Sequence, residues 1–182
     1  MFDEMLAYNK KFVEEKKYVD YAADKFPSKK VAILACMDTR LVKLLPAALG
    51  IKDGDVKMIK NAGAFITDPY DSTVRSMLVA IGELGVKELV VLGHTTCGVE
   101  KMEGAELIEI LEKDHGIDVA AAKAHAEAHG IDAAKWMNGF NTVEEAVKDT
   151  CKLLQDHPFI PKDVTVRGGV MDTITGGVTM LV

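Results

Sequence analysis

The chain has no excess of basic residues and no long apolar run. Lys and Arg total 22 against 28 Asp and Glu, which gives a net charge of −6 and leaves no basic stripe for a nucleic-acid backbone. No stretch approaches the roughly 18 apolar residues that span a bilayer. The first residues, Met-Phe-Asp-Glu, lack the basic and then apolar order of a signal peptide. We therefore expect a cytoplasmic protein whose partners are neither nucleic acid nor a membrane.

Cysteine is also scarce, with three in 182 residues. So few cysteines do not suggest a disulfide framework, and two of them end apolar runs, where metal ligands in a reducing compartment are the favoured interpretation. The third, Cys151, lies in a helical pattern and is expected to be a small buried apolar residue. The length fits a single domain over residues 1–182 with a sizeable core.

Short apolar runs rich in β-branched residues alternate with helical patterns in the first half of the chain. The expected elements are a strand at 31–36, a helix at 41–49, a strand at 56–60, a helix from about Asp71 to Leu84 and a strand at 88–94. Near-continuous apolar strands joined by helices are typical of a parallel sheet covered on both faces. The predicted fold class is α/β, with a central, mainly parallel sheet flanked by helices.

Three further regions complete the predicted fold. Residues 1–27 form an N-terminal helical arm that is expected to lie on its own domain or on a second subunit. Residues from about 101 to 154 are mostly helical and form an insert. A last strand at 164–167 precedes a C-terminal hairpin at 170–181 that turns at two glycines.

The most informative residues follow two of the predicted strands. Cys-Met-Asp-Thr-Arg at 36–40 follows one strand, and His-Thr-Thr-Cys-Gly at 94–98 follows another. Cys36, His94 and Cys97 offer two sulfurs and one imidazole, which suit three positions of a tetrahedral Zn²⁺, although cobalt or iron also accepts them. The fourth position is left for water or a carboxylate, as in a catalytic zinc site. Ligands of parallel sheets bind beyond the carboxyl ends of the strands, so position and chemistry agree.

Asp38 and Arg40 are two residues apart at a strand end and could form a charge-assisted, bidentate pair. An aspartate held in this way stays ionised and can accept a hydrogen bond from water on the metal. Alternatively, Asp38 turns onto the metal as a fourth ligand and closes the site. The sequence leaves both roles open.

In this order and spacing, the two motifs and the Asn-Ala-Gly turn at 61–63 resemble the β-class carbonic anhydrases, particularly the short archaeal and Gram-positive forms. The resemblance covers about residues 31–98 and, more loosely, the terminal strand and hairpin. It implies a lyase that interconverts carbon dioxide and bicarbonate through a zinc-bound hydroxide. It also implies a homodimer or larger homo-oligomer in which the N-terminal arm reaches the neighbouring subunit.

The same resemblance assigns roles to individual residues. Cys36, His94 and Cys97 would bind one Zn²⁺ per chain, Asp38 and Arg40 would form an orienting dyad, and the amide of Gly98 would help to hold bicarbonate. The sequence departs from the family pattern at Lys60, where arginine is common, and at Thr96, where aspartate or glycine is frequent. Residues of about 103–141 match no family feature and could narrow access to the site.

Two alternatives share these ligands. One is a zinc hydrolase of carbon disulfide or carbonyl sulfide, and the other is a non-catalytic zinc- or bicarbonate-sensing module. Elsewhere, His125 and His129 are four residues apart, and a solvated helix face is favoured over a metal site. His157 is expected at the surface or at a helix cap, and Trp136 in the core or an interface.

Overall fold

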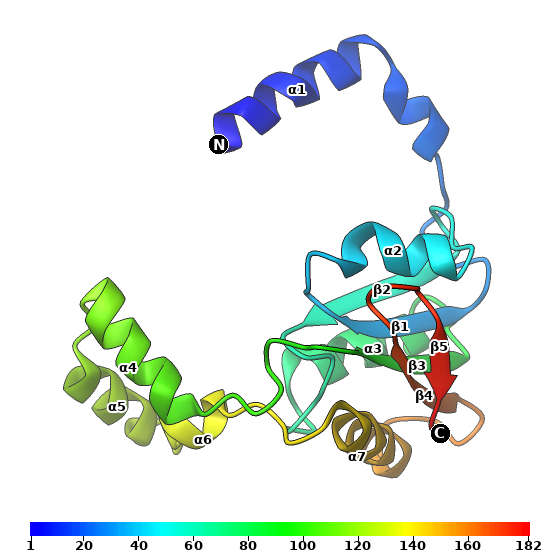
Figure 1. The fold of residues 1–182 in the computed structure, drawn as a ribbon. Coiled ribbons are helices and arrows are strands. Elements are labelled where there is room, and N and C mark those ends of the chain that lie inside the picture. The colour runs from blue at the N-terminus through cyan, green and yellow to red at the C-terminus, as the bar shows by residue number, and fades with distance from the viewer.

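A five-stranded sheet forms the centre of the computed structural model, which describes residues 1–182 (Figure 1). The strands are β1 (Val31–Cys36), β2 (Val56–Asn61), β3 (Glu88–His94), β4 (Thr165–Met171) and β5 (Val178–Met180). Their order is β2-β1-β3-β4-β5, with parallel pairing except between β4 and β5, which are antiparallel. The predicted fold class is confirmed.

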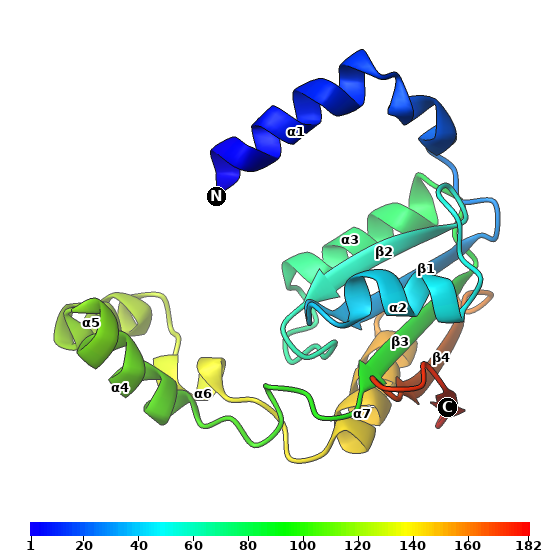
Figure 2. The same ribbon diagram turned by 45° about the horizontal axis from the view of Figure 1, so that its top comes forward.

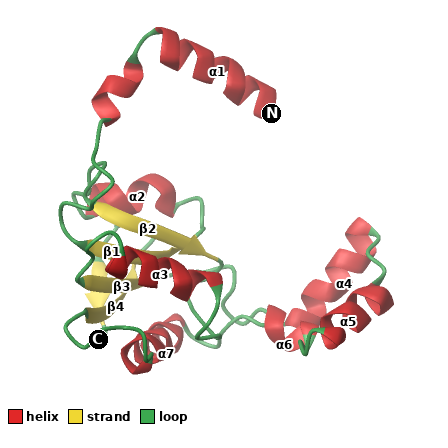
Figure 3. Ribbon diagram, turned by 180° about the vertical axis from the view of Figure 1, so that it is seen from behind, coloured by secondary structure: helices red, strands yellow, loops and turns green.

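Helices cover both faces of the sheet. The helices are α1 (Phe2–Glu14), α2 (Leu41–Ala48), α3 (Ser72–Gly82), α4 (Gly104–His115), α5 (Val119–Ala128), α6 (Ala133–Met137) and α7 (Val143–Asp156), with a 3₁₀ turn, η1, at Lys17–Tyr21. α2 lies on one face and α3 on the other, and α7 packs on β3 and β4 on the same side as α3 (Figures 2 and 3). The connection from β1 to β2 and the connection from β2 to β3 run in opposite directions along the sheet, so right-handed crossovers place α2 and α3 on opposite faces.

The core explains why the central strands are almost wholly apolar. Five of the six residues of β1 are buried, and so are five of the seven of β3, because each strand has helices on both sides. α7 approaches the sheet closely over Gly93 and Gly168, where an added Cβ would lie 2.6 Å from side-chain atoms of α7. Gly168 therefore lies against α7, while Gly169 lies against β5, and the strand predicted to end at Arg167 continues through both glycines to Met171.

The N-terminal arm projects away from the sheet (Figure 1). α1 has no buried residue and packs against η1. The helical arm predicted over residues 1–27 is an α-helix only as far as Glu14, because Lys16 adopts a left-handed conformation with φ 53° and only a 3₁₀ turn follows. An arm without a packing surface of its own gains little from a longer helix.

A second projection, formed by α4, α5 and α6, is called the lobe here and spans residues 104–137 (Figure 1). Its two connecting segments pair with each other: the Lys101 amide donates to the Phe140 carbonyl at 2.7 Å, and the Gly139 amide donates to that of Met102 at 2.8 Å. α7, the last part of the helical region predicted at about 101–154, packs on the sheet instead of the lobe. None of the helices has the length and apolar character needed to cross a membrane.

Candidate metal centre

The two sequence motifs meet at the carboxyl edge of the sheet. Cys36 is the last residue of β1 and His94 the last of β3, and these strands are parallel neighbours. From β1 the chain first crosses to β2 on one side and later to β3 on the other, so the strand order reverses between β1 and β3. Such a reversal leaves a crevice where ligands bind in α/β sheets.

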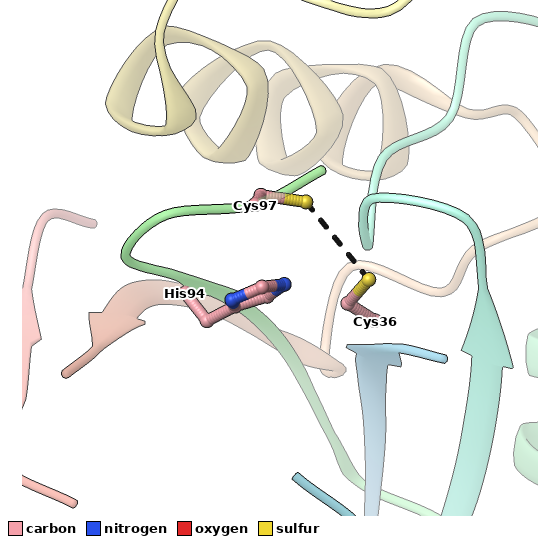
Figure 4. A group of neighbouring side chains, drawn as sticks. All are labelled: Cys36, His94 and Cys97. Atoms are coloured by element: carbon pink, nitrogen blue, oxygen red, sulfur yellow. Dashed lines mark hydrogen bonds between the residues drawn. The ribbon is translucent and has the colours of Figure 1, made fainter. Parts of the chain in front are cut away.

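Cys36, His94 and Cys97 point toward one another at this position (Figure 4). Their ligand atoms all lie within 4.8 Å of one another, and the three residues are buried. The two sulfurs are 4.0 Å apart. Zn–S bonds of about 2.3 Å in a tetrahedral site would place two sulfurs roughly 3.8 Å apart, so the thiol pair already has nearly the separation that such an ion requires.

His94 is oriented by its own loop. Its Nδ1 donates to the carbonyl of Thr95 at 3.0 Å, while the fully buried Nε2 has no hydrogen-bond partner. Burial lowers the pKa of His94, but the neighbouring Cys36 sulfur and the bond to the Thr95 backbone outweigh this effect and raise the pKa overall. A buried imidazole nitrogen without a partner is costly, whereas a metal-binding histidine typically holds its other nitrogen on a backbone carbonyl. The side chain therefore fits a metal ligand.

The surroundings of Cys36 favour its thiolate. The hydrogen bond with Cys97 is the largest cause of a strongly lowered pKa, and His94 and the amide of Gly63, 3.3 Å from Cys36 Sγ, lower it further. The same pair raises the pKa of Cys97, because a second negative sulfur beside Cys36 is unfavourable. A divalent cation would stabilise both thiolates, which are the metal-binding form of cysteine.

Asp38 lies at the edge of this group and faces Arg40. Its Oδ1 accepts from Arg40 Nε at 3.0 Å and its Oδ2 from Arg40 Nη2 at 2.8 Å. The Arg40 hydrogen bonds hold the pKa of Asp38 well below its usual range. Asp38 Oδ2 is 3.9 Å from His94 Nε2. The predicted bidentate pair is therefore present, beside the ligand group.

Several contacts of the site were not predicted from the sequence. Arg40 also donates to Thr96, Lys60 Nζ donates to the Cys36 carbonyl at 3.1 Å, and the Gly63 amide donates to the Cys36 sulfur. In the sequence, Lys60 and Thr96 differ from the family pattern, but nothing in their residue types indicates these contacts. Gly98 directly follows Cys97 and is exposed, with no atom within 4 Å of the position of an added Cβ.

The remaining histidines and the third cysteine lie elsewhere. Cys151 is fully buried, as predicted, and burial raises its pKa to about 11. Of the two positions predicted for His157, the helix cap is confirmed and the surface is wrong. His157 is the C-cap residue of α7 but is buried, where it accepts from the Phe159 amide and donates to the Pro69 carbonyl. His125 and His129 are exposed residues of the lobe and line an apolar cavity of about 520 Å³ together with Trp136, which is 70% exposed.

The family match of the chain includes the residues of the candidate metal centre. Residues 31–178 match the family described as carbonic anhydrase. The chain belongs to the carbonic anhydrase family. It is 42% identical over 182 residues to YtiB of Bacillus subtilis, which is provisionally named a carbonic anhydrase, and the match covers 100% of this chain and 96% of YtiB.

Other relatives place this carbonic anhydrase within its family. The crystal structure of β-carbonic anhydrase isoform I from Trichomonas vaginalis superposes with a TM-score of 0.86 at 28% identity, covering 100% of this chain and 97% of that one. A carbon disulfide hydrolase of Acidithiobacillus thiooxidans is 30% identical over 156 residues, covering 82% of this chain and 75% of the hydrolase. The predicted resemblance to β-class carbonic anhydrases is confirmed, and with it the assignment to this class of enzyme.

Proposed function

We propose that this carbonic anhydrase catalyses the reversible hydration of carbon dioxide to bicarbonate and a proton with one Zn²⁺ per chain. The observation that carries the proposal is the convergence of the Cys36, His94 and Cys97 ligand atoms within 4.8 Å beside an aspartate. Two thiolates and an imidazole suit Zn²⁺, whereas Mg²⁺ and Ca²⁺ prefer oxygen ligands. Cys36, His94 and Cys97 would hold the ion, which would supply the Lewis acidity that lowers the pKa of water and provides a nucleophile near neutral pH.

The protein's own residues orient the reactants. Asp38 stays ionised beside Arg40, so its carboxylate only accepts hydrogen bonds. In the proposed mechanism it accepts the O–H of the attacking water and thereby directs an oxygen lone pair toward carbon dioxide. Gly98 is an exposed residue directly after Cys97, and in the proposed mechanism its amide donates to an oxygen of the bicarbonate as negative charge develops on it.

The arrangement of Asp38 supports an open site over a closed one. Both carboxylate oxygens face the Arg40 guanidinium, at 3.0 and 2.8 Å. To become a fourth ligand, Asp38 would have to give up at least part of this bidentate pair. If Asp38 stays beside Arg40, the fourth position on the metal would be free for a reactant. An enzyme needs such a free position, whereas a permanently closed sensing site does not.

Hydration of carbon dioxide by stopped-flow spectrophotometry, with metal content measured on the same sample, tests the proposal. We expect stoichiometric zinc and a rate that rises from about pH 6 toward pH 9, because two thiolates offset the charge of the ion and weaken its Lewis acidity relative to a site with three neutral histidines. A plateau already reached near pH 6 contradicts this reasoning. The absence of activity at every pH in zinc-loaded protein contradicts the proposed reaction.

A carbon disulfide hydrolase is the second candidate, since one such enzyme is a relative at 30% identity. The higher identity to YtiB, 42% over the whole chain, favours carbon dioxide. Sulfide release from carbon disulfide, assayed beside carbon dioxide hydration, separates the two. Sulfide release without carbon dioxide hydration would replace the proposed substrate.

We also propose that the protein is a homodimer or larger homo-oligomer in a reducing, cytoplasmic compartment. All three cysteines are free thiols, which suits that compartment. The arm exposes apolar and aromatic side chains that are 46–69% accessible: Phe2, Met5, Leu6, Tyr8, Val13, Tyr18, Val19 and Tyr21. An exposed apolar patch of this kind typically marks an interaction surface. A second copy of the chain is the proposed occupant, and light scattering in solution tests it.

A further inference from the structure

Arg40 is held on two sides. One side of its guanidinium pairs with Asp38, and the other faces Thr96, 56 residues later in the chain. Nη1 donates to Thr96 Oγ1 and Nη2 to the Thr96 carbonyl, each at 2.9 Å. Four hydrogen bonds from the guanidinium therefore fix the position of a side chain that is 44% exposed.

Thr96 itself has an unfavourable backbone conformation. Its φ is 54°, in the left-handed region where a β-branched residue is an outlier. Glycine or asparagine would adopt this conformation at lower cost. Strained residues of this kind persist where surrounding contacts hold them, and they concentrate at functional sites. Here the strained residue lies between His94 and Cys97 and turns its hydroxyl to Arg40.

We propose that Thr96 is a positioning residue that acts through Arg40 to hold the Asp38 carboxylate in its orienting place. The threonine hydroxyl is the specific element, since every residue type offers the backbone carbonyl. The effect of Thr96 on the rate of hydration rests on the proposed function.

The exposure of Arg40 makes such a support necessary. An ion pair between exposed side chains contributes little by itself, because both chains lose freedom and water screens the charges. A guanidinium with donors fixed on both sides loses its alternative orientations and presents a constant partner to Asp38. Without the hydroxyl, Nη1 loses its acceptor, and Arg40 can turn about the remaining bonds and carry Asp38 with it.

Two variants separate the hydroxyl from the shape of the side chain. Thr96→Val keeps the β-branch and removes the hydroxyl, whereas Thr96→Ser keeps the hydroxyl. Thr179→Val is a matched control for the loss of a threonine hydroxyl. Thr179 lies on β5, is exposed and makes no hydrogen bond through its side chain. The chain has only three arginines, at 40, 75 and 167, so the Nε–H signal of Arg40 is readily assigned by NMR.

The experiment measures steady-state hydration and hydrogen exchange of the Arg40 Nε–H in each zinc-loaded variant. We expect Thr96→Val to lower kcat about tenfold, with KM changed less than threefold, and to speed the exchange, since a hydrogen bond to a charged group is lost. Thr96→Ser is expected to recover most of kcat and the slow exchange.

Three outcomes overturn the inference. The first is a Thr96→Val variant with wild-type kcat and exchange, the second is lost activity with unchanged exchange, and the third is a Thr96→Ser variant as impaired as Thr96→Val. An equal loss in Thr179→Val would also contradict a role specific to residue 96. Inactive wild-type protein would refute the proposed function alone, because the exchange measurement still tests the contact of Thr96 with Arg40.

Discussion

Replacement of Gly63 by alanine is expected to damage the metal centre through the backbone. Gly63 has φ +90°, and its amide donates to Cys36 Sγ at 3.3 Å. An added Cβ would lie 2.8 Å from a ring carbon of Phe65 and 2.9 Å from one of Phe140. These two rings pack edge to face with centroids 5.2 Å apart, so both must move to admit a methyl group.

The expected loss of stability has two parts. Alanine in the left-handed region costs about 1–2 kcal/mol, and a methyl group forced into a packed position costs about 1–3 kcal/mol. Gly63→Ala should therefore lower the free energy of unfolding by about 2–5 kcal/mol. Gly85 offers a matched control, because its φ is +72° and nothing lies within 4 Å of an added Cβ. Gly85→Ala should show only the backbone part, about 1–2 kcal/mol.

Urea unfolding at one protein concentration measures the two losses, and competition with a chelator measures zinc affinity. A displaced Gly63 amide no longer supports the Cys36 thiolate, so we expect zinc affinity to fall about tenfold or more in Gly63→Ala, equivalent to about 1.4 kcal/mol, and to be unchanged in Gly85→Ala. If both variants lose equal stability and both keep wild-type zinc affinity, the assigned roles of the ring contact and of the amide are wrong.

Three further predictions concern the ligands, the dyad and the arm. Cys97→Ser should abolish hydration and deplete zinc in elemental analysis, and full retention of both would exclude Cys97 as a ligand. Arg40 lowers the pKa of Asp38 in the folded protein, so the pair stabilises the fold above the unfolded pKa of about 4 and loses this effect as the pH falls. In metal-free protein, the difference in unfolding free energy between wild type and Asp38→Asn, under about 1 kcal/mol, should therefore shrink from pH 6 to pH 3 in urea unfolding. A difference that stays constant over this range would contradict the pairing. Leu6→Asp should lower the molar mass measured by light scattering, and it should leave the chain folded because α1 has no buried residue. Lys11→Asp should leave the molar mass unchanged. Equal masses for the two variants would argue against an interface on this face of the arm.

The sheet and the proposed ligand group can be predicted from local patterns in the sequence, above all from the apolar runs that form the strands. β1 and β3 begin and end where their apolar runs do, since strands buried on both faces allow no polar interruption. Cys36 and His94 then meet because parallel neighbours end at the same edge. The bidentate contact of Asp38 with Arg40 needs only two residues of separation.

The errors concern contacts that only the tertiary structure provides. His157 is buried because α7 carries it under the loop at Pro69, 88 residues earlier, and no local pattern reports such a neighbour. The contact of Arg40 with Thr96 spans 56 residues and requires a left-handed threonine, which its residue type does not suggest. The early end of α1 reflects the absence of a packing surface within the chain for an otherwise helical sequence.

The three proposed ligands differ in how firmly the fold holds them. Cys36 and His94 are fixed by strand pairing, in which a slip of one residue would turn each side chain to the opposite face. Cys97 lies on the following loop, and the left-handed Thr96 turns the chain there so that its sulfur comes within 4.0 Å of that of Cys36. The loop is therefore the adjustable part of the site.

The lobe is tied to this adjustable loop. The segment that leads into it begins at Val99, directly after Gly98, and Lys101 pairs with Phe140 on the returning segment. The Phe140 ring packs on Phe65 and lies beside Gly63, whose amide reaches the Cys36 sulfur. The lobe is thus connected to the proposed metal centre from two sides, through the Cys97 loop and through the Gly63 turn.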